Sequence, residues 1–304
     1  MKQTNYLITG ASGFLGRLLA DALKKKGAQV TGQGRAGQDL NLDITQPFSL
    51  PKDLDWDIIV HSAGKAHSVP RTAEEEQVFY QVNLEGTKNL CTAIEKLPKK
   101  PEAFVFISTV AVYGVDAGVL IPEDAPLNGT SPYAKSKILA EEWLGEWAEK
   151  TGIVLGTLRL PLIAGPNPPG NLGAMINGIK SGRYLSIGKA TARKSVVWAE
   201  DIADVIPKLA SVGGTYNLTD GYHPSFGELE RTIADSLGKK APIKIPMVLA
   251  KVLGYAGDLL GDRFPVNSDK LGKITSTLTF DDSKARQLLA WEPGRVLDRL
   301  GRTR

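Results

Sequence analysis

The stretch "SPYAKSK", from Ser131 to Lys137, places a phenol and an ammonium four residues apart, directly behind a proline. Proline is common in the first turn of a helix, and residues four apart share one helix face, so Tyr133 and Lys137 are expected to face one site. A nearby positive charge stabilises a phenolate, which predicts a tyrosine that exchanges protons near neutral pH. A surface helix that begins with polar residues would show the same pattern, so the surrounding motifs decide between the two interpretations.

A second pair of reactive groups closes the apolar run "FVFIST", where Ser108 and Thr109 end an expected strand. Open α/β sheets bind their ligands at the carboxyl ends of the strands. Hydroxyls at strand ends often only cap backbone groups. Beside Tyr133 and Lys137, however, they predict a metal-free site in which Thr109 hydrogen-bonds a substrate oxygen, Tyr133 transfers the proton, and Lys137 tunes the tyrosine and binds a nicotinamide ribose.

A glycine loop, "TGASGFLG", directly follows the first expected strand and begins a helical pattern. A turn before a helix would explain its three glycines nearly as well. Their position inside a βαβ unit predicts a dinucleotide site, because the helix N-terminus offers free N–H groups and a positive dipole end to a pyrophosphate. The residues expected to bind the cofactor here are Gly10, Gly13, Phe14, Leu15 and Gly16.

The second expected strand ends in "GQGRAG", without an acidic residue to bind the ribose hydroxyls of NAD. Arg35 stands there instead and favours NADP, with NAD as the alternative; Arg35 would equally suit a solvated turn. In "NLDIT", Asp43 and Ile44 are expected beside the adenine ring. The alternative for this pair is a helix cap followed by a core side chain.

Short β-branched runs alternate with helical patterns through the first two thirds of the chain, which predicts an α/β fold of the Rossmann type with a doubly wound parallel sheet. Residues 1–162 are expected to form the NAD(P)-binding domain, with segments near 195–220 returning to it. Residues 163–304 are expected to form mainly a smaller, partly interleaved substrate lobe.

The composition limits which partners and which cellular compartment are expected for this protein. A net charge of +4 over 304 residues, without an aromatic-rich basic tract, gives no reason to expect nucleic acid as a partner. The single cysteine, Cys91, excludes an internal disulfide and fits a cytoplasmic protein. The segment "PMVLAKVLGYAGDLLG" is expected to be an amphipathic helix packed on a core or a partner; its polar face is not strongly basic, so no membrane partner is expected.

The chain resembles the extended short-chain dehydrogenases/reductases that act on nucleotide sugars, the NAD-dependent epimerase/dehydratase family. The motifs that carry this resemblance span almost the whole length and occur in the family's order: "TGASGFLG", "NLDIT", "IIVHSAG", "VNLEGTKNL", "ISTVAVYG", "PYAKSK", "LRLPLIAGP", "VVWAEDIA", "TYNLTDG" and "FDDSKARQLLAWEP". It is most similar to small epimerase-like or 4-ketoreductase-like members associated with surface polysaccharide synthesis.

The resemblance implies a role for several residues. Thr109, Tyr133 and Lys137 would be the catalytic hydroxyl, tyrosine and lysine. Further cofactor contacts would come from Ala63, Gly64, Asn83, Ser108 and Pro161. The diphosphate of the substrate would be held by Asn171, Leu172 and either Arg193 or Lys194, although a helix cap and a solvated strand edge are open alternatives. Lys65 and His67, on a loop at the same sheet edge, are further candidates for sugar or phosphate contacts, whereas His61 is expected to be a packed structural residue.

Departures from the family's pattern limit the reaction. Val110 and Ala111 replace the acidic pair of the 4,6-dehydratases, and Leu162 stands where many members have asparagine, which loosens the substrate assignment. The sequence therefore predicts a 4-epimerase that acts at hexose C4 of a nucleoside diphosphate sugar, which is expected to be UDP-linked. The alternatives are an NADPH-dependent 4-ketoreductase, a reductase of small carbonyl compounds and a non-catalytic dinucleotide sensor. The resemblance implies a homodimer that joins through the two long helices, although helical stripes also pack internally.

Overall fold

A computed structural model describes residues 3–66, 68–260 and 268–302. Its centre is a seven-stranded sheet in the order β11-β7-β5-β4-β1-β2-β3, and every neighbouring pair in it is parallel. Parallel strands need crossover connections, which the intervening helices supply. The predicted Rossmann-type α/β fold is therefore confirmed.

The strands are β1 (Asn5–Thr9), β2 (Gln29–Gly34), β3 (Leu40–Asn41), β4 (Ile58–His61), β5 (Ala103–Thr109), β6 (Gly118–Ile121), β7 (Val154–Leu160), β8 (Leu162–Ala164), β9 (Leu185–Ile187), β10 (Val196–Trp198), β11 (Gly214–Asn217), β12 (Ile243–Ile245) and β13 (Leu278–Phe280). The α-helices are α1 (Phe14–Lys25), α2 (Ala73–Tyr80), α3 (Gly86–Glu95), α4 (Pro132–Thr151), α5 (Gly170–Lys180), α6 (Ile202–Val212), α7 (Phe226–Ser236), α8 (Met247–Leu260), α9 (Ser268–Thr275), α10 (Ser283–Leu289) and α11 (Val296–Leu300). Three short turns complete the order: η1 (Gln81–Glu85), η2 (Val110–Tyr113) and η3 (Ala199–Asp201).

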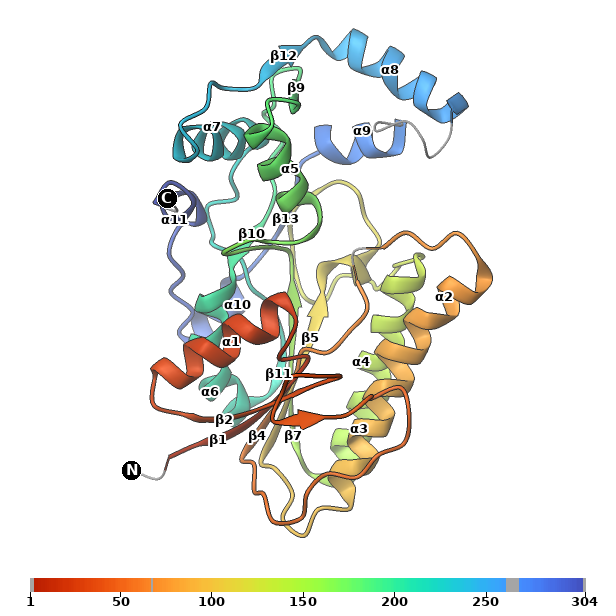
Figure 1. Cartoon of the computed structure of the whole chain (residues 1–304), viewed down its shortest axis with the longest axis vertical. Coiled ribbons are helices and arrows are strands. Elements are labelled where there is room, and N and C mark those ends of the chain that lie inside the picture. The colour runs from red at the N-terminus through yellow and green to blue at the C-terminus, as the bar shows by residue number, and fades with distance from the viewer. Residues whose placement is uncertain (1–2, 67, 261–267, 303–304) are drawn as a thin grey trace.

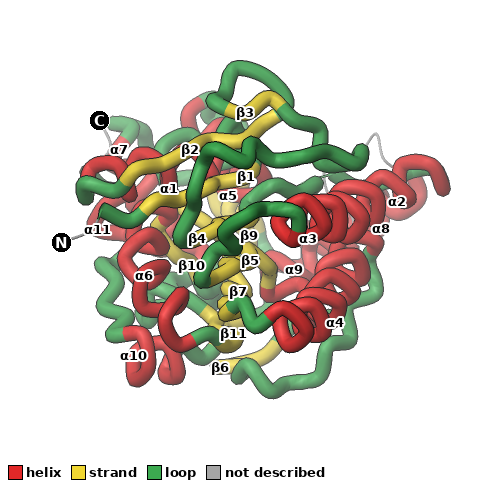
Figure 2. Tube along the Cα trace, turned by 90° about the horizontal axis from the view of Figure 1, so that it is seen from below, coloured by secondary structure: helices red, strands yellow, loops and turns green. Residues whose placement is uncertain are grey.

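Helices cover both faces of the sheet. Figures 1 and 2 show α1 and α6 on one face and α3 and α4 on the other, with the sheet between them. Each face has its own apolar core: one joins the sheet to α1 and α6, and the other joins it to α3 and α4. Burial on both faces explains why β5 reads as an unbroken apolar run rather than an alternating one.

The later part of the chain forms three two-stranded parallel pairs, β8 with β10, β9 with β12, and β6 with β13. Helices α5, α7 and α11 pack with β10 around a separate apolar cluster, and Figure 1 shows α5, α7, α8 and α9 beyond one end of the sheet. The segment from Ala199 to Asn217 instead packs with the central sheet, where β11 is an edge strand. The expected division into two domains, with residues near 195–220 returning to the first, stays a prediction.

One expected helix is interrupted. The helical pattern over residues 75–97 forms α2 and α3, and a single π-helical turn, η1, joins them. A π turn inserts an extra residue and re-aims the side chains beside it, and such turns are frequent at functional sites. Asn83 lies in this turn, and its side chain is buried.

Candidate active site

The glycine loop between β1 and α1 is crowded at two glycines, Gly10 in the loop and Gly16 in the first turns of α1. Gly10 adopts a left-handed φ of +69°, and a Cβ atom there would lie 2.7 Å from the Ala63 Cα atom. A Cβ atom at Gly16 would collide with the Gly10 carbonyl oxygen. The backbone of the loop is therefore open to a close ligand at the N-terminus of α1, and this cradle fits a dinucleotide pyrophosphate.

The end of β2 carries the expected cation and also an acid that sequence reasoning missed. Arg35 follows β2 and is exposed, and the Ala11 amide donates to the Gln33 carbonyl oxygen at 3.0 Å, which ties the glycine loop to this strand end. Asp39 returns to the same edge, where its carboxylate accepts a hydrogen bond from the Gly32 amide at 2.7 Å. Asp39 lies beyond the end of β2 in the sequence, and its carboxylate comes back to this strand only because the chain folds back.

Asp43 and Ile44, which follow β3, lie in different environments. The Asp43 carboxylate accepts hydrogen bonds from the amide and hydroxyl of Thr45, which lower its pKa. Ile44 is buried, and its side chain packs so closely on Gly86 that a Cβ atom at residue 86 would lie only 2.9 Å from it. The local geometry thus resembles the alternative of a capped turn followed by a core side chain, and contact with adenine stays a prediction.

The three catalytic candidates meet at the carboxyl end of β5. The Thr109 hydroxyl accepts a hydrogen bond from the Ala111 amide at 3.2 Å and also hydrogen-bonds Tyr133. Tyr133 and Lys137 lie one turn apart near the start of α4, whose first turn is fixed by Pro132 and by the Ser131 hydroxyl that accepts from the Ala134 amide. The elements thus place all three side chains at one strand end, as the spacing predicts.

Lys137 is buried beneath this group. Its ammonium donates to the Ile107 carbonyl oxygen at 2.8 Å and lies 4.4 Å from the centre of the Phe106 ring. Burial lowers the pKa of Lys137 to about 8, and the nearby Glu141 carboxylate opposes this shift. Lys137 is therefore mostly charged at neutral pH but close to its titration range.

Tyr133 differs from the expectation. Burial raises the pKa of its phenol, and the hydrogen bond with Thr109 only partly offsets this effect. Sequence reasoning expected Lys137 to lower this pKa, but no such contribution from Lys137 is present. The expectation failed because spacing on a helix shows that two groups are close but not how far water is excluded around them.

Two neighbouring segments complete the floor of the site. A Cβ atom on Gly64 would lie 3.1 Å from the Asn83 side-chain oxygen and 3.5 Å from the Lys137 ammonium nitrogen. The Asn83 amide accepts from the Lys65 backbone N–H at 2.8 Å and donates to the Ser136 hydroxyl at 2.9 Å. Asn83 therefore holds the loop after β4 against α4, which keeps Ala63 and Gly64 between the glycine loop and Lys137. Pro161, at the end of β7, is half-buried at the same sheet edge.

A buried ionic network behind the site was not anticipated. The Ser108 hydroxyl donates to Glu141, and the Arg159 guanidinium forms an ion pair with the same carboxylate at 2.7 Å. Arg159 also donates to the Tyr113 hydroxyl at 3.2 Å. The Ser108 hydroxyl is therefore already engaged by Glu141, and its expected contact with a cofactor stays a prediction. The sequence held one signal, because Glu141 lies four residues after Lys137 on the same helix face.

His61 is a packed structural residue, as expected. Its two ring nitrogens share hydrogen bonds with the hydroxyls of Thr9 and Thr87 at 2.6 and 2.9 Å. Burial, with a smaller contribution from the Lys137 charge, lowers the pKa of His61 to about 3. The imidazole is therefore neutral under ordinary conditions, and it does not serve as an acid or base in this site.

The residues expected to hold the substrate are less closely gathered. Asn171 is exposed in the first turn of α5, where Pro169 rather than Asn171 is the N-cap, while the Leu172 side chain belongs to the apolar core. Lys65 is half-buried, with its ammonium 5.4 Å from the centre of the Phe79 ring. His67 lies outside the described residues.

Arg193 and Lys194 have different environments. The Arg193 guanidinium donates to the His223 carbonyl oxygen at 2.8 Å and lies over the Tyr222 ring. Lys194 is half-buried; burial lowers its pKa, and Asp116 opposes this shift. Asp116 follows the turn after β5, and contact of Arg193 or Lys194 with a substrate diphosphate stays a prediction.

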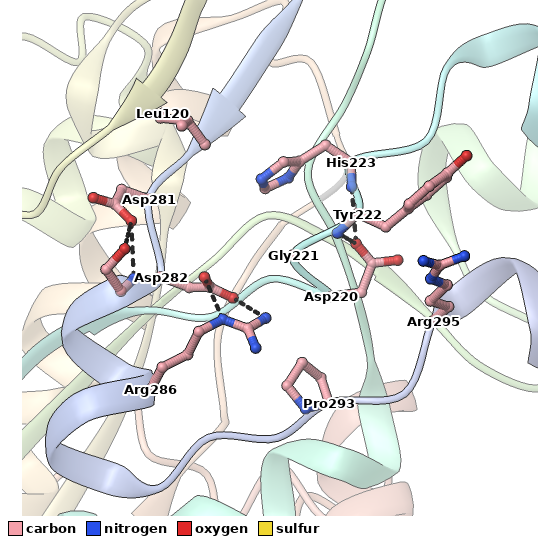
Figure 3. A pocket seen from close by; sticks show the side chains of 11 residues that line it. Leu120, Asp220, Gly221, Tyr222, His223, Asp281, Asp282, Arg286, Pro293 and Arg295 are labelled. Carbon is pink, nitrogen blue, oxygen red and sulfur yellow. Dashed lines mark hydrogen bonds and ion pairs between the residues drawn. The ribbon is translucent and has the colours of Figure 1, made fainter.

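A cavity of about 410 Å³ lies elsewhere, between the loop after β11 and the start of α10 (Figure 3). Its two buried carboxylates, Asp220 and Asp282, already have partners. Asp282 pairs with Arg286 at 2.9 Å, and the Asp220 carboxylate accepts from the amides of Tyr222, His223 and Val296. None of the residues predicted to be catalytic lines this cavity, and in the described parts of the chain no three His, Cys, Asp or Glu side chains gather to hold a metal ion.

A model of the family described as "NAD dependent epimerase/dehydratase family" matches residues 6–218. The chain belongs to this family. One relative is the N-acetyl-alpha-D-glucosaminyl-diphospho-ditrans,octacis-undecaprenol 4-epimerase of Escherichia coli O157:H7, which is 30% identical, with 92% of this chain and 88% of the relative covered. The UDP-glucose 4-epimerase of Vibrio cholerae is 27% identical, over 96% of this chain and 91% of that protein.

Solved structures show the same fold. The UDP-glucose 4-epimerase of Thermotoga maritima, in a structure with UDP-glucose, superposes with a TM-score of 0.76 at 20% identity, covering 98% of this chain and 96% of that one. The UDP-glucuronic acid 4-epimerase of Bacillus cereus, in complex with NAD, gives a TM-score of 0.73 at 20% identity, with 98% and 96% covered. Among the described residues, no helix of this family member is long and apolar enough to cross a membrane.

Proposed function

We propose that this protein is an NAD(P)-dependent 4-epimerase of nucleoside diphosphate hexoses, with UDP-linked sugars as substrates. The observation that carries the proposal is the meeting of Thr109, Tyr133 and Lys137 at the end of β5, beside a glycine cradle that fits a dinucleotide. The relatives support the reaction, since those of E. coli O157:H7 and V. cholerae are both 4-epimerases. No relative named here supports a small-carbonyl reductase or a sensor.

Tyr133, Thr109 and Lys137 each have a separate role in the proposed proton transfer. Tyr133 is protonated at neutral pH because burial raises its pKa, so it donates to an oxygen that gains electrons at C4 and takes the proton back in the reverse step. Thr109 orients that oxygen, and Lys137 supplies a buried positive charge beneath it. A bound nicotinamide would accept hydride from C4 and return it to the opposite face. Asn83 and Gly64 keep the space above Lys137 open.

The choice between NADP and NAD rests on two residues at the end of β2. Arg35 is exposed and would meet a 2′-phosphate, which supports NADP. The Asp39 carboxylate at the same edge would instead bind ribose hydroxyls, as NAD requires. We retain NADP as the proposal, and nucleotide extraction from purified protein distinguishes the two.

A second substrate class has a specific observation in its favour. The E. coli O157:H7 relative is named for a sugar linked through a diphosphate to undecaprenol. Both classes present a hexose on a diphosphate, so Asn171 and Lys194 would serve either. We further propose a cytoplasmic homodimer that joins through α3 and α4 and serves surface polysaccharide synthesis; Leu139 on α4 offers an exposed apolar side chain for such a contact.

The test is turnover of UDP-glucose, UDP-galactose and their 2-acetamido forms, followed by product identity and by absorbance of reduced nicotinamide. A 4-epimerase interconverts each pair without net change in that absorbance. Tyr133→Phe should lower turnover by roughly a hundredfold or more while cofactor binding is kept, because the phenol is a proton donor rather than a structural contact. Net consumption of NADPH with a 4-keto sugar would show a ketoreductase instead, and full activity of Tyr133→Phe would refute the assignment of the site.

A further inference from the structure

The loop after β4, residues 62–65, is held at two backbone amides. The Ala63 amide donates to the Thr9 hydroxyl at 3.2 Å, and the Lys65 amide donates to the Asn83 side chain at 2.8 Å. Thr9 ends β1 and directly precedes the glycine loop, whereas the Asn83 side chain also donates to a hydroxyl on α4. The two contacts therefore fix this floor of the cofactor site on both of its sides.

His61, the last residue of β4, connects these two contacts. Its Nδ1 atom lies 2.6 Å from the Thr9 hydroxyl. Its Nε2 atom lies 2.9 Å from the Thr87 hydroxyl, which in turn donates to the Asn83 carbonyl oxygen at 2.7 Å. One imidazole therefore reaches the partner of each loop amide, Thr9 directly and Asn83 through Thr87. We call these four side chains the His61 relay.

The hydrogen-bond partners determine which nitrogen of His61 carries the proton. A carbonyl oxygen can only accept, so the Thr87 hydroxyl uses its single proton on Asn83, and its oxygen accepts from Nε2–H. A neutral imidazole has one N–H group, so Nδ1 accepts a hydrogen bond from the Thr9 hydroxyl. The Thr9 oxygen then accepts from the Ala63 amide. The other tautomer would draw the Thr87 proton away from the Asn83 carbonyl oxygen.

The sheet holds the imidazole in this orientation. Strand β4 lies between β1 and β5, and the register places Thr9 and Phe106 opposite His61 on these two strands. The imidazole is stacked on the Phe106 ring, with 5.9 Å between the ring centres, and the Phe104 ring lies 5.8 Å away. His61 has no exposed surface. Packing therefore keeps each nitrogen directed at its own hydroxyl.

We propose that His61, protonated at Nε2, is a positioning residue for the nicotinamide cofactor. Because it is fully buried, it acts through Thr9 and Thr87 and does not itself touch the cofactor. With the relay intact, residues 62–65 stay in the conformation that leaves the space beside Lys137 open. With the relay broken, only a fraction of the molecules has this conformation, and the apparent affinity for the cofactor falls by that fraction. The proposal rests on the cofactor site and not on the proposed reaction.

The first measurement is the tautomer of His61 in the full-length protein without cofactor, from two-bond nitrogen–proton correlations of isotope-labelled histidine. The chain has three histidines, and the signal of His61 is the one that is lost in His61→Asn. We expect a proton on Nε2 and none on Nδ1 at neutral pH. A proton on Nδ1, or an equal mixture of both tautomers, would overturn the relay.

The second measurement is cofactor affinity, by fluorescence titration with NADPH and with NADH in the absence of any sugar. Thr87→Val removes the acceptor of Nε2–H and should lower the affinity about fivefold to tenfold, whereas Thr87→Ser keeps the hydroxyl and should bind as the original protein does. Thr31→Val is the matched control, because it removes a hydroxyl that accepts from the Trp56 ring N–H at 3.0 Å outside the relay. Its affinity for the cofactor should be unchanged.

The relay also predicts that effects of its members do not add. His61→Asn combined with Thr87→Val should bind the cofactor no more weakly than the weaker of the two single variants. Where Thr87→Val is too unstable to titrate, Thr9→Val breaks the relay at its other end and should lower the affinity by a similar factor.

Two results would show that His61 only stabilises the fold and would overturn the proposal. One is the same cofactor affinity for Thr87→Val as for Thr31→Val, and the other is a double variant whose loss is the product of the single losses. Because binding is measured without turnover, a protein that shows the expected affinities but does not interconvert UDP-linked sugars would contradict only the proposed function.

Discussion

His61 gives this protein a specific dependence of stability on acid. The imidazole is fully buried in β4 between the hydroxyls of Thr9 and Thr87, and its pKa is about 3 in the folded protein. In the unfolded chain a histidine titrates near 6.5. Between these two values the unfolded chain binds a proton that the folded protein does not, so acid favours unfolding.

The magnitude follows from the separation of the two pKa values. Stability from this source is complete above about pH 6.5 and falls by about 1.4 kcal/mol for each pH unit below it, until the folded histidine itself titrates near pH 3. Lowering the pH from about 6.5 to about 5 should therefore cost about 2 kcal/mol through His61 alone. The carboxylates of the protein add their own acid dependence, so a matched variant is required.

The assay is denaturant unfolding of the original protein and of His61→Asn at several pH values. Asparagine keeps a side-chain amide within reach of Thr9 but does not titrate, so the variant should be less stable at pH 7 and should lack the His61 part of the slope. The difference in unfolding free energy between the two proteins should shrink by about 2 kcal/mol between about pH 6.5 and about pH 5. A difference that stays constant over this range would show that His61 is protonated in the folded protein and would refute the reasoning.

Three further predictions concern the site. Because the pKa of Lys137 is about 8, the affinity of the protein for the cofactor should fall about tenfold per pH unit above that value. Arginine stays charged in this range, so the Lys137→Arg variant should not show this decline, even if it binds the cofactor more weakly overall. Arg35→Gln should weaken NADP binding about tenfold to a hundredfold and leave NAD binding unchanged, measured by fluorescence titration; equal effects on both cofactors would contradict a 2′-phosphate contact. Glu141→Gln leaves the Arg159 guanidinium buried without its ion pair and should lower the free energy of unfolding by about 3–5 kcal/mol, measured with denaturant. Glu85→Gln removes an exposed ion pair and should lower it by under about 1 kcal/mol.

The sheet and the placement of the candidate catalytic group were predictable because both depend on local patterns. The unbroken apolar run of β5 followed by two hydroxyls, and the proline that begins α4, fix where Thr109 and Tyr133 lie. The glycine loop was predictable for a similar reason, since the crowding of Gly10 against Ala63 leaves no room for a side chain at that position. In each case one short segment determines the geometry.

Features that depend on several distant segments could not be predicted. Asp39 reaches Gly32 only because the chain turns back after β2, and Arg159 on β7 meets Glu141 only because α4 packs against β7. The exposure of one face of α8 depends in the same way on where the chain leaves a helix uncovered. Periodicity identified that helix as amphipathic, but it could not show which face the rest of the fold would bury.

Burial moves the two titrating groups of the site in opposite directions. It raises the pKa of the Tyr133 phenol and lowers that of the Lys137 ammonium, because a water-poor site disfavours charge of either sign. The raised pKa of Tyr133 favours donation of a proton, and additional positive charge in the cleft would favour the reverse step. If the glycine cradle and Lys137 hold a nicotinamide cofactor as proposed, its oxidised ring would supply such a charge. Proton transfer by Tyr133 in both directions would then suit the 4-epimerase proposed for this site.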